Sequence, residues 1–150
     1  MKTYASWTHG NSLTVESPQK LDRNGHFGWG VDMSVKPGES GWFHISVPTP
    51  VIVADVRSQL QKVFLMFNAT GGQIHEVHVY DGSTKVQEFK GLNLNGEHRN
   101  GLDGSNTFTL ATPHTVWWGI GITFSFTADI ASDGPPSRLI LGSAGGDFYA

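Results

Sequence analysis

The segment WFHISV at residues 42–47 alternates strictly between apolar side chains and polar or aromatic ones. Successive side chains of an extended strand point to opposite faces, so its phenylalanine, isoleucine and valine share one face. Trp42 and His44 lie on the other face, together with a serine. The segment therefore predicts a half-buried β-strand, which Pro48 ends or bends.

A second segment, IHEVHVY at residues 74–80, alternates in the same way before an Asp-Gly turn signal at residues 81–82. Its two valines are expected to face inward. The side chains expected on the outer face are Glu76, His78 and Tyr80.

Other apolar segments also favour strands. Residues 63–67 are apolar on both faces, which is typical of a central sandwich strand, and residues 68–72 predict a hairpin after it. The longest alternating run, residues 116–127, predicts a strand with Trp118 facing the core and Trp117 facing outward. Shorter strands are expected at residues 13–16, 27–32, 51–54, 85–89, 107–110, 138–144 and 147–149.

One segment also fits a helix. The spacing of Val56, Leu60, Val63 and Phe67 suits an amphipathic helix from residue 55. We favour a strand from Val63, because an apolar run that ends at a Gly-Gly turn is the simpler interpretation, and we expect a helical turn at residues 55–60. Residues 91–105 predict a long loop with an excursion of its own.

These segments give about nine or ten short strands and no long helix. The predicted fold class is all-β, an antiparallel β-sandwich of jelly-roll type. A chain of 150 residues is about the size of one domain, so residues 1–150 are expected to form a single domain. The chain has no cysteine, and a core of this size needs neither a disulfide nor a metal to fold.

Charge and hydropathy argue against several classes of protein. The net charge of −3 lacks the basic footprint of a nucleic-acid binder. The apolar stretch at residues 116–126 is too short and too interrupted to span a membrane. The first ten residues carry no apolar signal segment, which predicts an unprocessed, cytoplasmic protein.

The leading candidate for a functional site is a group of histidines that lie beside aromatic residues. His44 follows Trp42 by two residues, and His78 precedes Tyr80 by two, so each pair shares the outer face of its strand. If the two strands are neighbours in register, these side chains form one polar and aromatic patch together with Ser46 and Glu76. The patch is either a ligand site or merely the solvent-facing side of a sheet.

Catalytic and metal-binding chemistry has weaker support. Histidines from different strands, with His9 or His114 as a third ligand, would be needed for zinc, and the sequence has no HExxH motif. It also has no GxSxG motif, and Glu76 with Glu88 or Asp81 has no spacing that defines an acid–base pair. We therefore predict no metal or other cofactor, with His44 and His78 as general acid or base only if the protein is an enzyme.

A separate feature is the expected outer face of residues 117–127. Glycines at positions 119 and 121 beside Trp117 would form a shallow shelf for a flat ligand such as a sugar ring. The same tryptophan would equally suit a subunit interface.

Three blocks of the sequence carry a family resemblance. They are SWTHGNS with VE (residues 6–12 and 15–16), GWFHISVPTP (residues 41–50) and VHVYDG (residues 77–82), with a WGIG run at residues 118–121. Together they resemble an uncharacterised bacterial and fungal domain family of unknown function. The resemblance implies no catalytic role, but His9, Trp42, His44 and His78 lie inside its blocks.

The sequence leaves three functions open. The first is a lectin-like module for a small-molecule or carbohydrate ligand, working as a homo-oligomer that gains avidity from several weak sites. Its candidate ligand-binding residues are Trp42, Glu76, Tyr80 and Trp117. The second is a small enzyme, a cyclase, lyase or hydrolase, and the third is a structural protein that self-assembles through its exposed aromatic residues.

Overall fold

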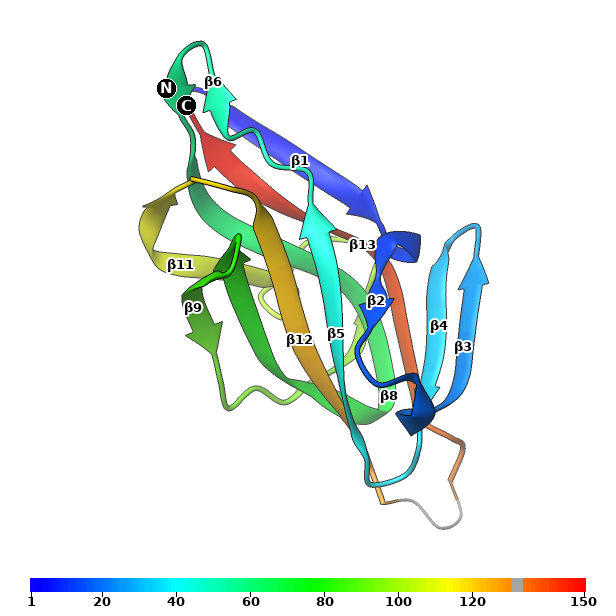
Figure 1. The fold of residues 1–150 in the computed structure, drawn as a ribbon. Helices are drawn as coiled ribbons and strands as arrows, with labels where there is room; N and C mark the ends of the chain where they lie inside the picture. Colours follow the sequence, from blue (N-terminus) through cyan, green and yellow to red (C-terminus); the bar gives the residue numbers. More distant parts are fainter. Residues whose placement is uncertain (131–133) are drawn as a thin grey trace.

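The computed structural model describes residues 1–130 and 134–150 as an antiparallel β-sandwich (Figure 1), which confirms the predicted fold class. The described residues form thirteen strands, more than the nine or ten expected, and two short 3-10 turns at Gly10–Ser12 and Pro18–Lys20. None of the described helices is long or apolar enough to cross a membrane. The strands are β1 (Thr3–His9), β2 (Thr14–Val15), β3 (Leu21–Phe27), β4 (Gly30–Val35), β5 (Ser40–Val47), β6 (Ile52–Val53), β7 (Val56–Arg57), β8 (Gln59–Asp81), β9 (Thr84–Phe89), β10 (Leu94–His98), β11 (Thr107–Thr115), β12 (Ile120–Ala128) and β13 (Arg138–Tyr149).

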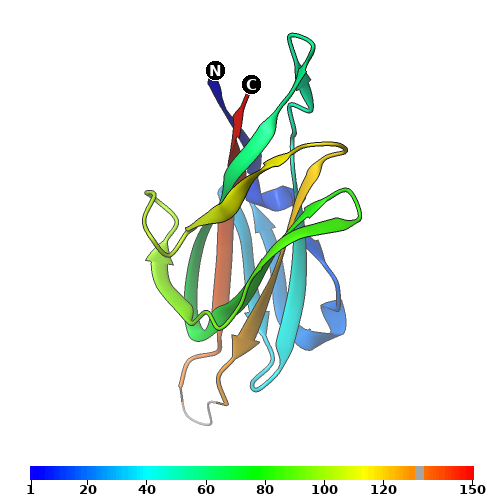
Figure 2. The ribbon, with the colours of Figure 1, turned by 90° about the vertical axis from the view of Figure 1, so that its left-hand side faces the viewer.

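Strand β8 belongs to both layers of the sandwich (Figure 2). Its first half pairs with β13, β10 and β11, whereas its second half pairs with β12 and β9. The chain changes direction between the halves at Gly71, whose φ of 64° suits glycine. The predicted hairpin at residues 68–72 is therefore wrong, because the two halves pair with different strands and not with each other.

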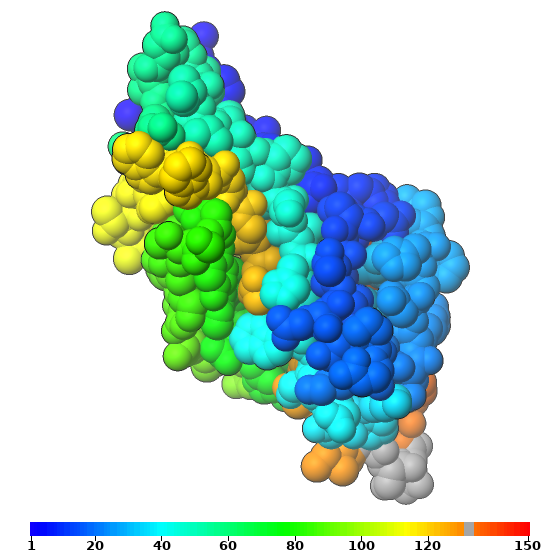
Figure 3. Space-filling model, in the orientation of Figure 1, coloured from blue at the N-terminus to red at the C-terminus, as the bar shows by residue number. Residues whose placement is uncertain are grey.

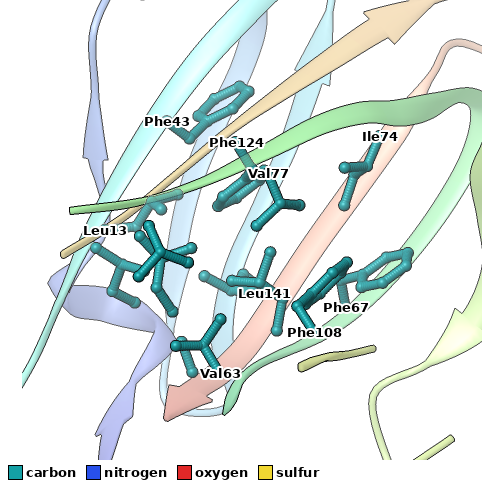
Figure 4. Packing of buried hydrophobic residues seen from close by; sticks show 14 of the residues in the cluster. Leu13, Phe43, Val63, Phe67, Ile74, Val77, Phe108, Phe124 and Leu141 are labelled. Atoms are coloured by element: carbon teal, nitrogen blue, oxygen red, sulfur yellow. The ribbon is translucent and has the colours of Figure 1, made fainter. Parts of the chain in front are cut away.

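The hydrophobic core fills the space between the layers (Figure 4). One layer runs β2-β5-β12-β8-β9, and the other contains β3, β4, β13 and the first half of β8, with β1 on β13. Phe43 and Phe124 from the first layer stack with ring centroids 5.4 Å apart. The second layer contributes Phe67 and Leu141, which are fully buried.

The alternation predicted for residues 42–47 and 74–80 is present in β5 and β8. The inward side chains of β5 are buried, and its outward ones are partly or fully exposed. A bulge near residue 75 lets both Ile74 and Val77 face the core. Residues 63–67 are buried on both faces, as predicted, because Trp7 stacks on Phe64 from outside.

Several boundaries differ from the predictions. Residues 55–60 form no helical turn. Ala54 and Asp55, with φ of 49° and 64°, instead make a tight turn between β6 and β7. The strand expected at residues 27–32 is broken by the β3–β4 turn, and the loop at residues 91–105 contains β10. Residues 138–144 and 147–149 belong to one strand, β13. The sequence DGPP at residues 133–136 also predicts a turn or short linker, and part of it lies outside the described residues.

Candidate ligand-binding groove

A groove of about 550 Å³ crosses the outer face of β5, β12 and the second half of β8. Figure 3 shows this face, with β12 recessed between β5 and the β8–β9 hairpin. A volume of this size is typical of sites for small molecules. The groove residues used below are Glu16, Trp42, His44, Ser46, His78, Tyr80, Lys85, Gly121 and Thr123.

Three rows of residues run across the floor, with β12 in the middle. Thr123 pairs with His44 on β5 and with His78 on β8. The two histidines are thus on the same face but are separated by one strand, roughly 10 Å between Cα atoms at two strand spacings. The row on one side is Trp42–Ser125–Glu76, and the row on the other side is Ser46–Gly121–Tyr80.

One end of the groove is a fixed aromatic wall. The Trp42 ring on β5 lies 5.2 Å from the His78 ring on β8, tilted by 53°. His78 Nε2 lies 3.1 Å from Glu76 Oε1, and only 9% of His78 is exposed. Glu76 thus contributes indirectly, by orienting the His78 imidazole. The geometry leaves the Trp42 indole as the larger exposed surface.

His44 joins the edge of the groove to its floor. Its Nδ1 lies 2.8 Å from Thr123 Oγ1, and its Nε2 lies 2.9 Å from Glu16 Oε1. Glu16 reaches this position because Thr14 on β2 pairs with His44 on β5. Both ring nitrogens of His44 therefore have partners within the protein, which fixes the ring and holds the Glu16 carboxylate at the rim.

The other end of the groove is open. A Cβ built on Gly121 would meet no atom within 4 Å, so the floor between Ser46 and Tyr80 is free backbone surface. Lys85 pairs with Tyr80 across the β8–β9 hairpin. Hydrogen bonds from Lys85 and Lys90 lower the pKa of Glu88 to about 2, and the bond to Glu88 in turn raises the pKa of Lys85.

Trp117, the remaining candidate, is not in the groove. Strand β12 begins at Ile120, and residues 117–119 form a turn before it. The Arg57 guanidinium lies 4.1 Å from the centre of the Trp117 ring. Trp118, expected to face the core, is 75% exposed. The predicted shelf of Trp117, Gly119 and Gly121 is therefore wrong, because only Gly121 belongs to the strand.

A buried carboxylate causes this turn. Asp81 accepts hydrogen bonds from the backbone N–H groups of Trp117, Trp118 and Gly119 at 2.8, 2.8 and 3.0 Å, and from His114 Nε2 at 2.8 Å. Burial raises the pKa of Asp81, but the hydrogen bonds from His114 and the turn outweigh burial and lower it below the usual 3.8. Three consecutive amides that point at one carboxylate cannot belong to an alternating strand.

The other chemistry considered from the sequence does not assemble. In residues 1–130 and 134–150, no group of three or more His, Asp or Glu side chains is placed to hold a metal ion. His9 and His114 bond instead to the Gly28 carbonyl and to Asp81. Glu88 is held by two lysines and Asp81 by its turn, so neither forms a free carboxylate pair with Glu76.

Four of the candidate residues predicted from the sequence line this groove, and the structure adds two residues that the sequence analysis missed. Trp42, His44, His78 and Tyr80 line it, and Glu76 supports it. Glu16 was missed as a site residue because nothing in the sequence pairs β2 with β5. Lys85 was missed although the Asp-Gly turn at residues 81–82 implied a hairpin that places it opposite Tyr80.

Comparison with known proteins gives a family but no activity. A model described as a family of unknown function, DUF6623, matches residues 1–140. The chain belongs to DUF6623. This confirms the resemblance to an uncharacterised family noted from the sequence. A search of the curated proteins finds no match to this DUF6623 chain.

Solved structures similar to the DUF6623 chain include carbohydrate-binding modules. One is a low-affinity xylan-binding module, CBM86, from the gut symbiont Roseburia intestinalis, with 12% sequence identity and a TM-score of 0.51 over 97% of this chain and 96% of that chain. Another is the module CBM36 in complex with calcium and xylotriose, with 11% identity and a TM-score of 0.41 over 95% of this chain and 98% of that chain. At this identity the first likeness shows a shared β-sandwich fold.

Proposed function

We propose that the protein is a carbohydrate-binding module whose ligand, an uncharged oligosaccharide, lies across β12 in the groove. The observation that carries the proposal is the open floor at Gly121, which lies beside Tyr80 in the same groove as the Trp42 ring. Aromatic rings present flat apolar area to the C–H face of a sugar ring. The polar side chains around the floor supply hydrogen bonds for the hydroxyl groups.

The polar groups suit hydroxyl recognition because they offer both donors and acceptors. Glu16 at the rim accepts, Lys85 at the opposite rim donates, and the Ser46 hydroxyl does both. Their charges oppose one another across the groove, so no net charge selects an ionic ligand. An uncharged saccharide is the ligand class that uses all of these groups.

Binding is favoured over catalysis by the state of the histidines. His44 has both ring nitrogens engaged, by Thr123 and by Glu16. His78 is nearly buried between Trp42 and Glu76. A general base needs a ring nitrogen within reach of a substrate proton. These imidazoles shape the walls of the groove instead.

Soluble xylan and xylo-oligosaccharides are the first ligands to test, because the Roseburia intestinalis module with the same fold is a xylan-binding module. Binding would be measured by affinity electrophoresis and by calorimetry. Trp42→Ala is expected to weaken binding about 10- to 100-fold, as loss of a central aromatic contact does. Trp117→Ala is the control, because Trp117 is an exposed tryptophan that lies outside the groove.

Two results would contradict the proposal. One is equal binding by the wild type and Trp42→Ala. The other is cleavage of the saccharide, measured as new reducing ends in the same samples, which would favour the enzyme. If xylan does not bind, a panel of other uncharged polysaccharides extends the test, and failure of the whole panel rejects the proposal.

The homo-oligomer predicted from the sequence belongs to this proposal, because linking several weak grooves would raise the apparent affinity for a long polysaccharide. Light scattering of the purified protein gives its mass in solution. Neither the oligomer nor the predicted cytoplasmic location is required for one groove to bind one saccharide chain.

A further inference from the structure

A second groove, of about 620 Å³, lies on the outer face of the other layer. Phe67 on β8 and Leu141 on β13 face the core. Their neighbours along the two strands, Asn68, Ile140 and Gly142, line the groove on the outer face. Its side chains come from the β3–β4 turn, from β8, β10 and β13, and from the loop that follows β10. Those used below are Trp29, Glu97, Arg99, Asn100, Arg138 and Ser143.

The HGN segment, singled out in the sequence but unused by the first groove, fixes one wall of this second groove. His9 Nε2 lies 2.9 Å from the Gly28 carbonyl oxygen, and Asn11 Nδ2 donates to the Phe27 carbonyl oxygen at 2.6 Å. A Cβ on Gly10 would lie 2.0 Å from the Leu141 carbonyl oxygen. Only glycine allows this close approach, so the HGN segment clamps the β3–β4 turn and its Trp29 against β13.

Trp29 in turn holds Arg99. The indole stacks on Phe27 with a centroid distance of 5.1 Å, and the Arg99 guanidinium carbon lies 5.4 Å from the centre of the indole. The Arg99 stem runs along Gly142, where a Cβ would lie 3.2 Å from Arg99 Cγ. A guanidinium that stacks on an indole uses its flat face for the contact. Its N–H groups point outward in the guanidinium plane, where they can donate to a carboxylate.

The charges of this groove are unbalanced. Within residues 1–130 and 134–150, Arg99 has no carboxylate within 4 Å, and its buried Nε has no hydrogen-bond partner. Arg138 is paired with Asp32, but that single carboxylate is shared with Arg23. Among the described lining residues, Glu97 is the one carboxylate. Because Nε is fully buried, an anion in the groove would be bound by the terminal Nη groups of Arg99.

We propose that this second groove binds an acidic sugar, a uronate, through its carboxylate. The carboxylate would be held by the forked N–H groups of Arg99 beside the positive charge of Arg138. Asn100, Ser143 and Glu97 provide donors and acceptors for the ring hydroxyl groups. The proposal is independent of the first groove, since the two grooves lie on opposite layers and share no residue.

Glucuronate and glucose form a matched pair of probes, because they differ only at C6, where glucuronate has a carboxylate and glucose a hydroxymethyl group. The measurement is a titration of the 150-residue protein, followed by two-dimensional ¹H–¹⁵N NMR of the Trp29 indole N–H and the Arg99 Nε–H. Glucuronate is expected to shift both signals and to bind at least about 10-fold more tightly than glucose, with weaker binding at high salt. Equal binding of the two sugars would overturn the proposal.

Two variants test the role of Arg99. Arg99→Lys keeps the charge and loses the fork, so it is expected to bind glucuronate about 10-fold more weakly, and Arg99→Ala is expected to abolish binding. Arg57→Ala is the matched control. Arg57 also lies against an indole, but its N–H groups already donate to the carbonyls of Val116 and Trp117. Unchanged binding in either Arg99 variant, or a glucuronate-induced shift of the Trp42 signal in place of Trp29, would overturn the assignment. Loss of xylan binding by Trp42→Ala leaves it untouched.

Discussion

The first groove and the turn at residues 117–119 both expose aromatic rings beside a glycine, but we propose a ligand only for the groove. In the groove, Gly121 opens a floor between Ser46 and Tyr80, and Trp42 lies at the other end of the same groove. In the turn, the backbone N–H groups are used by Asp81, and Arg57 covers the Trp117 ring. We therefore expect a concave floor with free polar groups to be a better guide to a site than exposure of an aromatic ring.

Filling the floor of the groove should have the largest effect. Gly121→Leu places a side chain where a Cβ meets nothing within 4 Å, so the fold is expected to be retained while the ligand is excluded. We expect saccharide binding to weaken at least about 100-fold through the steric clash. Calorimetry measures the affinity, and thermal unfolding checks the fold.

Gly119→Leu is the matched substitution in the turn, since a Cβ there also meets nothing within 4 Å. It should leave the affinity within about 2-fold, a change of roughly 0.4 kcal/mol. If Gly119→Leu blocks binding and Gly121→Leu does not, the roles of the two regions are reversed.

Removing the charge that organises the turn should cost stability. Asp81→Asn replaces an acceptor for four donors with an amide that carries two donors of its own. We expect unfolding to require about 1–3 kcal/mol less free energy, measured by denaturant titration. A loss below about 0.5 kcal/mol would show that the turn does not depend on this carboxylate.

The difference in unfolding free energy between the wild type and Asp81→Asn should depend on pH in a defined direction. Because folding lowers the pKa of Asp81, its ionised form stabilises the protein fully above the usual carboxyl pKa of 3.8. That stabilisation is lost as the pH falls through the lower pKa of the folded state. The difference in unfolding free energy between the wild type and Asp81→Asn should therefore be constant near neutral pH and shrink below about pH 4. A difference that grows on acidification would contradict the direction of the shift.

Tyr80→Phe should give a smaller effect on binding. It keeps the ring over the groove and removes one hydroxyl, so the affinity for the saccharide is expected to fall about 2- to 10-fold, as for one hydrogen bond. Calorimetry against the wild type measures this change. A loss as large as that of Trp42→Ala would mean that the hydroxyl, and not the ring, carries the Tyr80 contact.

Trp117→Ala should have the smallest effect of all. The ring lies outside the groove beneath Arg57, so its loss is expected to change saccharide affinity by less than about 2-fold. Affinity electrophoresis run beside Trp42→Ala makes the comparison direct. Loss of binding in this variant would restore the shelf inferred from the sequence.

The sequence predicted the fold where a local pattern decides it. Period-two alternation placed Trp42, His44, His78 and Tyr80 outward, because a strand half-buried in a sandwich needs that pattern. It failed at residues 68–72 and 116–119, where distant partners decide the structure. No periodic pattern in the sequence shows which strands pair with each half of β8. None shows that the buried Asp81 accepts hydrogen bonds from three backbone amides either.

The candidate groove was only half predictable for the same reason. Which residues face outward follows from each strand alone, but which strands lie side by side does not. The strand between His44 and His78 is β12, more than forty residues further along the chain, and Glu16 arrives through β2. The sequence therefore indicated which side chains could line the groove, but not the order of the strands that carry them.

The five tryptophans allow the most direct test of the central claim, that saccharide binds across β12 and not at the exposed turn. Titration of ¹⁵N-labelled protein with a xylo-oligosaccharide, followed through the five indole N–H signals, reports on every region at once. We predict that the Trp42 signal shifts while those of Trp117 and Trp118 stay in place. Movement of the Trp117 and Trp118 signals with a stationary Trp42 would contradict the account.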